Sequence, residues 1–332
     1  MRKLLLLSTL LFLCGKGISQ QVPLYSQYIL NEFILNPAVA GIDGMTSVNF
    51  SGRKQWVGLK YAPETYFASI STRILKSPFG ISNRRVRQGS KGRVGLGGYF
   101  LSDRNGAINR THFQLTYAYH IFLQNYQLSF GLSAVTSQFK IDERLAELGP
   151  DDPLNSILGK SAYYFDANFG VNFATPKANI GLSVNQLIQS RLRFGEIDLD
   201  RDTLTLDHVR YLTLTGYYRL RLRNRNWEFE PSFLANSNIV SENVYTMGYK
   251  PNLQATVTGR FIYKREYWAG LSVRTTGDMI LLMGLKVNKF YIGYSFDYGF
   301  SQVTRVSKGS HEVVLAIKFG DSTRRYRWLE RY

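Results

Sequence analysis

The side chains that could do chemistry are few, and the histidines are the first to consider. His112 and His120 fall on one face of the same predicted strand. Eight residues of strand separate them, about 26 Å at the usual rise, so the two imidazoles cannot chelate one metal ion. Asp166 and Asp297 lie on the polar faces of other predicted strands, and nothing in the sequence places either carboxylate beside a histidine.

Sequence motifs of known catalytic or cofactor sites are also missing. The chain has no GxSxG, no HExxH and no phosphate-binding P-loop. The glycine-rich stretch GRVGLGG (92–98) opens a predicted strand rather than a helix, so it is not a phosphate loop. We therefore expect no catalytic residue, no metal site, no cofactor and no enzymatic activity, and a lipase or protease built on a barrel is the weakest alternative.

The N-terminus predicts export. Arg2 and Lys3 precede the apolar stretch LLLLSTLLFLC, and small residues follow it, so we predict a Sec-type signal peptide over 1–19 with cleavage after Ser19. Cys14 is the only cysteine and would leave with the signal, which excludes disulfides and thiol chemistry in the mature chain. The net charge of +17 could suit a nucleic acid, but export and the lack of a nucleic-acid-binding motif argue against that partner.

The strongest pattern after residue 19 is alternation with a period of two residues, which predicts an all-β chain. We expect a transmembrane β-barrel of the outer-membrane type with about 14 antiparallel strands, many of them near ten residues long. A secreted β-sandwich is the alternative. The predicted strands are 45–53, 65–74, 93–102, 110–121, 126–138, 162–173, 178–188, 209–220, 226–236, 254–263, 267–274, 278–288, 290–298 and 311–319, with 243–250 as a possible further strand.

The two faces of these strands differ in composition. One face is rich in aromatic and aliphatic residues, as in YYFDANFGVNF, where Tyr163, Phe165 and Phe169 alternate with polar or small residues. The other face is rich in Gly, Ser, Asn and Thr, as expected of a wet or plugged lumen. The predicted division is a signal peptide at 1–19, an N-terminal periplasmic or plug segment at 20–44, a barrel at 45–319 and a basic periplasmic tail at 320–332.

The links between predicted strands alternate in length. Short links mostly follow even-numbered strands and long links follow odd-numbered ones, with 75–92 and 275–277 as exceptions. This alternation is typical of short periplasmic turns and long outer loops. The long link 75–92 carries no acid and five basic residues, Lys76, Arg84, Arg85, Arg87 and Lys91. It is therefore a candidate docking surface for an acidic partner. The alternative is that it is a solvated turn.

Two stretches near the N-terminus are distinctive, the opening YSQYILNEFILNPAVAGIDG and RKQWVGLKYAPETYFASIST (53–72). The first resembles the start, and the second a hairpin, of the PorP/SprF family of type IX secretion membrane proteins. The segments 267–301 and 309–319 resemble its late hairpins and its closing strand. The resemblance therefore runs from just past the signal to the end of the barrel, and its most specific residues are Asn36, Pro37, Gly41, Trp56 and Gly58.

The resemblance implies an outer-membrane barrel that serves protein secretion and gliding motility. It implies as partners the outer-membrane lipids, a periplasmic secretion ring or anchoring lipoprotein, and the C-terminal domain of an exported adhesin. The polar lumen face leaves a second function open, a diffusion porin or hydrophobic-solute channel.

The stretch LNPAVAG (35–41) sets the last expectation. Asn36 precedes Pro37, which stops any helix built on the residues before it, and Ala38, Ala40 and Gly41 allow close approach to other backbone. We predict that residues 23–41 tuck against or into the periplasmic mouth of the barrel and partly plug it.

Overall fold

The computed structural model describes residues 25–74, 92–123, 126–142, 159, 161–193, 205–207, 210–238, 253–300 and 306–320. The predicted signal peptide, the basic residues of the 75–92 link, the possible strand at 243–250 and the tail after residue 320 lie outside these ranges. Within them, no helix has the length and apolar character needed to cross a membrane.

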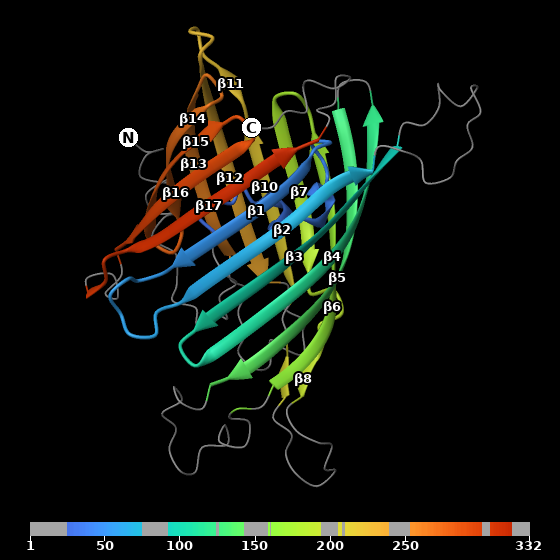
Figure 1. Ribbon diagram of the computed structural model, residues 1–332, viewed down its shortest axis with the longest axis vertical. Coiled ribbons are helices and arrows are strands. Elements are labelled where there is room, and N and C mark those ends of the chain that lie inside the picture. The colour runs from blue at the N-terminus through green and yellow to red at the C-terminus, as the bar shows by residue number, and fades with distance from the viewer. Residues whose placement is uncertain are drawn as a thin grey trace, which may run out of the picture.

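Fourteen antiparallel strands in the described part of the chain close into one barrel (Figure 1). Each strand pairs with its sequence neighbours, and β1 pairs with β17 from Thr46 opposite Phe319 to Lys54 opposite His311, which closes the ring. The strands are β1 (Thr46–Lys54), β2 (Glu64–Ile74), β3 (Gly92–Asn105), β4 (Ile108–Leu123), β5 (Tyr126–Ile141), β6 (Ser161–Ala174), β7 (Ala178–Asn185), β10 (Tyr211–Tyr218), β12 (Trp227–Asn238), β13 (Leu253–Tyr263), β14 (Tyr267–Arg274), β15 (Asp278–Val287), β16 (Phe290–Gly299) and β17 (Ser310–Phe319).

The predicted strand number is confirmed, but several strands are longer than predicted. β4 and β5 have 16 residues each, against the nine to eleven that cross a membrane. Because β3 and β4 are longer than predicted, the expected link at 103–109 is only a two-residue turn, in which Gly106 has a φ of 60°. At the end of the barrel where this turn lies, the wall formed by β3–β6 extends past the other strands (Figure 1).

Three short strands were not predicted as separate elements, although the predicted strand 209–220 includes the first residue of β11. β11 (Leu220–Arg221) extends the hairpin of β12. β8 (Arg191–Arg193) and β9 (Thr205–Asp207) pair in a separate small sheet, within a region that the sequence predicts as loop. Their residues are too few to show alternation, so periodicity could not find them.

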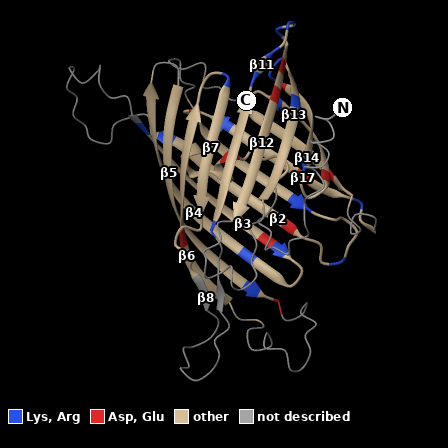
Figure 2. Ribbon diagram, turned by 180° about the vertical axis from the view of Figure 1, so that it is seen from behind, with Lys and Arg blue, Asp and Glu red and all other residues tan. Residues whose placement is uncertain are grey.

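The barrel has two distinct ends. At the end we call the short-turn end, β13 and β14 are joined by three residues and β15 and β16 by two. At the opposite end, the long-loop end, β1 and β2 are joined by 55–63 and β7 leads to β10 through 186–210. Charged residues gather mainly towards the strand ends and turns, and the hairpin at β11 ends in basic residues (Figure 2).

The two faces of the wall are as predicted. Outward side chains are large and apolar, as in β6, where Tyr163 and Phe165 are 67% and 71% exposed. Inward side chains are small and polar, as in β1, where Ser47, Asn49 and Ser51 are buried. An apolar outside and a polar inside reverse the usual soluble arrangement and suit a wall that faces lipid.

The inward polar groups are buried because the chain fills its own lumen. Residues Tyr25–Gly44, which we call the plug, precede β1 and contain α2 (Glu32–Leu35) and the 3-10 helix η1 (Pro37–Val39). Tyr28 and Phe33 are 2% and 5% exposed, and they pack against apolar side chains of the wall. The plug residues extend from the short-turn mouth of the barrel into the other half of the lumen.

Candidate functional site: the plugged lumen

The first residues of the plug are held by buried charges in the long-loop half of the lumen. Arg53 of β1 bonds to Asp297 of β16 (Nη2 to Oδ2, 2.7 Å) and to Glu312 of β17 (Nη1 to Oε2, 3.2 Å). Ser26 donates its backbone N–H to Glu312 at 2.8 Å and its hydroxyl to Asp297. Gln27 donates its N–H to Glu312 at 3.3 Å. We call the three charged residues Arg53, Asp297 and Glu312 the front anchor.

The later residues of the plug are held by close packing against glycines of the wall. A Cβ built at Gly131 would overlap the Pro37–Ala38 peptide, and one at Gly95 would overlap the carbonyl of Ala40. Other inward glycines approach the plug in the same way. Because glycine has no side chain, these positions together leave a groove in the wall that receives the plug. The remaining glycines of this groove are Gly97 beside Phe33, Gly170 and Gly181 beside Asn36, and Gly293 beside Leu30.

The carbonyl groups of this part of the plug are satisfied by side chains of the wall. Ser183 donates to the carbonyl of Leu35 at 2.6 Å. His120 Nε2 lies 2.9 Å from the carbonyl of Ala40, and since a carbonyl only accepts, the proton is on Nε2. Arg73 donates through Nε to the carbonyl of Gly41 at 2.8 Å. Buried backbone groups are therefore paired across the plug–wall interface, as folded proteins require.

The plug ends at an ion pair beside β1. Lys318 Nζ lies 2.9 Å from Asp43 Oδ2, and both side chains are nearly buried. Burial opposes ionisation of Asp43, but the ammonium of Lys318 outweighs it, so the pKa of Asp43 is below its ordinary value. Asp43 is therefore ionised at neutral pH and fixes the point where the plug becomes the first strand.

The five residues that carry the family resemblance separate into two places. Asn36, Pro37 and Gly41 lie in the plug, where Asn36 Oδ1 accepts the N–H of Ala38 at 2.9 Å and Nδ2 donates to the carbonyl of Val171 at 3.0 Å.

Trp56 and Gly58 lie instead in the β1–β2 loop, at the long-loop end. The neighbouring residue Val57 donates its N–H to Gly309 at 2.8 Å, just before β17. Trp56 and Gly58 therefore belong to a loop that is hydrogen-bonded to the chain just before the closing strand. They are not among the described residues that form the groove of the plug.

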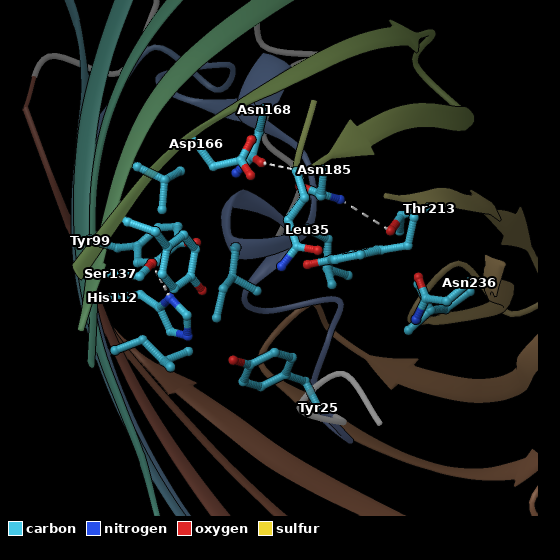
Figure 3. Close-up of a pocket in the computed structure, with 17 residues that line it drawn as sticks. Tyr25, Leu35, Tyr99, His112, Ser137, Asp166, Asn168, Asn185, Thr213 and Asn236 are labelled. Atoms are coloured by element: carbon cyan, nitrogen blue, oxygen red, sulfur yellow. Dashed lines mark hydrogen bonds between the residues drawn. The ribbon is translucent and has the colours of Figure 1, made fainter. Parts of the chain in front are cut away.

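A cavity of about 90 Å³ remains between the plug and the wall in the long-loop half of the lumen (Figure 3). Plug residues form one side of it, and β3, β4, β5, β6, β7, β10 and β12, with Gln186 just after β7, supply the rest. Room of this size takes several waters or a small chemical group, far less than the pockets of drug-sized ligands. The lining consists of Tyr25, Ile34, Leu35, Tyr99, Leu101, His112, Val135, Ser137, Tyr164, Asp166, Asn168, Asn185, Gln186, Tyr211, Thr213, Leu234 and Asn236.

The cavity brings together two groups that the sequence could not place side by side. His112 Nδ1 lies 2.6 Å from Ser137 Oγ, a contact that a catalytic serine would also need. Asp166 lines the same cavity, but its Oδ1 accepts the backbone N–H groups of Ala167 and Ile188 and does not orient the imidazole. The described residues therefore hold no completed Ser-His-Asp triad, and no cluster of three or more metal-binding side chains.

Sequence reasoning missed the front anchor. Arg53 and Glu312 were visible as charges on strands with a polar face, and Asp297 was noted only as a lone acid. A closed barrel makes the first and last strands neighbours, so opposite charges on their inner faces were a signal that could have been used.

A closed 14-strand barrel with an apolar outside and a plugged polar lumen defines a transmembrane barrel of the outer-membrane type. A model of one protein family, the type IX secretion system membrane protein PorP/SprF, matches residues 18–317. The chain therefore belongs to this family of membrane proteins, which is not a family of enzymes.

No curated protein matches the chain. Among solved structures, a deletion mutant of the TodX monoaromatic hydrocarbon channel aligns at 11% identity with a TM-score of 0.46, over 93% of this chain and 99% of that one. The toluene transporter TbuX of Ralstonia pickettii aligns at 9% identity and 0.47, over 86% and 92%. BamA of Haemophilus ducreyi, lacking POTRA domains 1–3, aligns at 10% and 0.42, over 83% and 70%.

Proposed function

We propose that this chain is a non-enzymatic component of the type IX secretion and gliding machinery that binds partner proteins and does not conduct solutes. The observation that carries this proposal is the seated plug. Its backbone overlaps the space of any side chain at Gly95 or Gly131, and buried charges hold its first residues. A lumen filled in this way leaves binding at the two ends of the barrel as the available activity.

The proposed location is the bacterial outer membrane, reached through the Sec signal peptide. The exposed aromatic and aliphatic side chains of the wall would contact the outer-membrane lipids. By the usual rule of short periplasmic turns, the short-turn end faces the periplasm. Plug residues Asn36–Gly41 would then fill the periplasmic half of the lumen, and the cavity would lie in the outer half.

The proposed docking surface for an acidic partner is the basic link 75–92, with Lys76, Arg84, Arg85, Arg87 and Lys91. Exposed basic residues of the described turns at the same end support it. Arg223, Arg225 and Lys264 extend from these turns and have no carboxylate within 4 Å among the described residues. Candidate partners are the periplasmic secretion ring, its anchoring lipoprotein and the C-terminal domain of an exported adhesin.

The test is charge reversal at Arg84→Glu, Arg85→Glu and Arg87→Glu in one variant. Expressed in a strain that lacks the native protein, this variant should lose capture of the periplasmic partner and secretion of the exported protein together. The matched control is Lys60→Glu, Arg104→Glu and Lys308→Glu, three exposed positions at the long-loop end, which should leave both readouts normal. Normal capture and normal secretion in the first variant would reject the docking surface.

A solute channel is the second candidate, and the polar inner wall is the observation that favours it. Ser47, Asn49, Ser69 and Thr116 would line a wet passage if the plug moved aside. Purified protein in a planar bilayer separates the two functions. Silence supports the secretion component, and a steady ionic current from the unaltered protein would favour the channel.

A further inference from the structure

The turn between β13 and β14 has a backbone that does not suit its residues. Lys264 and Arg265 have φ angles of 53° and 58°, and Glu266 donates its N–H to the carbonyl of Tyr263 at 3.0 Å. Lys264 and Arg265 therefore hold the two central positions of a type I′ turn, which favour Asn and Gly. Other tight turns in the described part of the chain follow this preference at φ > 0, with Gly106, Gly277 and Asn288.

A carboxylate partner accounts for only one of these two basic residues. Arg265 donates to Glu228 Oε1, from Nη2 at 3.0 Å and from Nε at 3.2 Å. Lys264 has no carboxylate within 4 Å among the described residues. A lysine is strained in this left-handed conformation, and such strain is concentrated at functional sites. The charge of Lys264 therefore calls for a partner outside the chain.

Aromatic side chains place this turn at the boundary of the membrane. Trp227 and Tyr267 are 39% and 54% exposed on the outer wall, and the ring centres of Trp227 and Tyr263 are 4.8 Å apart. Tyr263 lies on the same face of β13 as the exposed Phe261. Trp and Tyr at strand ends mark the level of the lipid headgroups. Lys264 Nζ lies 5.4 Å from the ring centre of Tyr263, so its ammonium is on the lipid side of the wall.

A second basic turn lies directly beside the first. Lys264 donates its N–H to the carbonyl of Asn226 at 2.7 Å, which joins the turn to the tip of the β11–β12 hairpin. Arg225 precedes Asn226 in that tip, is exposed, and has no carboxylate within 4 Å in the described ranges. Basic residues gather at this tip in Figure 2. An ammonium and a guanidinium on neighbouring turns are suited to a phosphate, which accepts hydrogen bonds from both.

We propose that Lys264 and Arg225, beside the rings of Trp227 and Tyr263, bind the phosphate of an anionic phospholipid in the leaflet at the short-turn end. A lipid is favoured over an acidic protein because the ammonium lies over an outward ring at the headgroup level. These two residues are thereby assigned to the membrane rather than to a protein partner. The inference rests on the barrel crossing a membrane, and it does not depend on the proposed secretion function.

The experiment measures lipid binding beside Trp227. The full-length protein is reconstituted in dioleoylphosphatidylcholine bilayers that contain dibrominated phosphatidylglycerol or, for reference, dibrominated phosphatidylcholine. Bromine quenches tryptophan fluorescence at short range. The protein has four tryptophans, so each protein is compared with its own Trp227→Phe form, and the difference isolates Trp227.

The parent should prefer phosphatidylglycerol at this ring, and the preference should depend on both basic residues. Each basic residue near an anionic surface strengthens binding about fivefold. Lys264→Asn combined with Arg225→Asn should therefore lower the preference at least about fivefold and bring it close to that for phosphatidylcholine. The matched control is Lys177→Asn combined with Lys289→Asn, which removes two exposed charges from other turns of the same end and should keep the preference.

Urea unfolding separates loss of binding from loss of structure. Asn tolerates a positive φ better than Lys does, so Lys264→Asn should unfold at the same or a higher urea concentration than the parent. A lower midpoint would show that the lysine serves the fold and would overturn the inference.

Two further results would also overturn it. One is a parent without preference for phosphatidylglycerol, and the other is an equal loss of preference in the control. If the parent showed no lipid preference but Lys264→Asn with Arg225→Asn lost capture of the periplasmic partner, these turns would belong to a protein-docking surface and the lipid site would be rejected.

Discussion

The two ends of the plug are held by different physics. The front anchor binds Ser26 and Gln27 through buried charges of Arg53, Asp297 and Glu312. The end nearer β1 is held by close backbone packing, where glycines of the wall leave room for Pro37–Gly41. An ion pair is strong but tolerates small shifts of its two groups, whereas close backbone packing is lost when one methyl group is added. Removing a charge should therefore release the front end of the plug, and enlarging a glycine of the wall should release the other end.

The largest effect is expected at the front anchor. Arg53→Met leaves Glu312 buried without a guanidinium and leaves Asp297 with only the longer contact to Arg274, at 3.7 Å. Removing one partner of a buried ion pair typically costs about 3–5 kcal/mol. Urea unfolding followed by tryptophan fluorescence measures the loss. Maleimide labelling of a Ser26→Cys variant in a Cys14→Ser background locates it, because only the front end should become reactive.

Lys54→Met is the control for that change, since Lys54 pairs with Glu64 at 2.6 Å but is 54% exposed. An exposed pair contributes less than about 1 kcal/mol, so the control should unfold nearly as the parent does. Equal losses in the two variants would show that burial of the cluster has no energetic weight.

The next effect is expected in the groove. Gly131→Ala places a methyl group on the Pro37–Ala38 peptide and should cost about 1–3 kcal/mol by overpacking. The displaced plug should admit a steady current in planar bilayers, where the parent is silent. Gly52→Ala is the control, because its Cβ would meet Tyr66 at an ordinary 3.6 Å; a current from the control or none from Gly131→Ala would contradict the groove.

A smaller effect is expected at Asn36. Asn36→Ala removes the bond to Val171 and the cap on the N–H of Ala38, a loss of about 1–2 kcal/mol. Thermal unfolding of the purified protein checks it against Asn224→Ala, an exposed turn asparagine that caps Asn226. If both variants melted together, the hydrogen bonds of Asn36 would add nothing to seating the plug.

The smallest effect is expected from acid. The pKa of Asp43 is below the ordinary value of 3.8, so its contribution is fully present above that value and is lost as pH falls through the lowered pKa. Labelling of an Ala40→Cys variant in a Cys14→Ser background at falling pH, before global unfolding, reports release of this end. Adding Asp43→Asn should remove the pH dependence, and a transition that persists in that variant must come from another group.

Much of the fold could be predicted because alternation is a local property of the sequence. Tyr163 and Phe165 alternate with buried Tyr164 and Asp166, and this pattern alone identifies β6 as a two-faced strand. Strand lengths were harder, since the residues that extend β4 and β5 at the long-loop end no longer need to alternate once they leave the membrane. The turn at Gly106 follows from these extensions and was missed with them.

The site could be predicted only in part, for a related reason. The small residues around Pro37 indicated close approach to other backbone, and the groove of glycines is the matching surface. The wall partner of each plug residue depends on how the closed barrel places its strands around the plug, as with Ser26, which bonds to Glu312 of β17, and Leu35, whose carbonyl accepts from Ser183 of β7. Three-dimensional closure supplies that information, and a linear pattern does not.

The front anchor also sets an order of events in folding. Ser26 bonds to Glu312, 286 residues later in the chain, and the same cluster includes Arg53 of the first strand. These groups come together only when β1 has paired with β17, so the plug has no complete seat in an open sheet. Seating of Ser26 and Gln27 is thus a late step, after the last strand has arrived, and protection of Ser26 would mark a barrel whose assembly is finished.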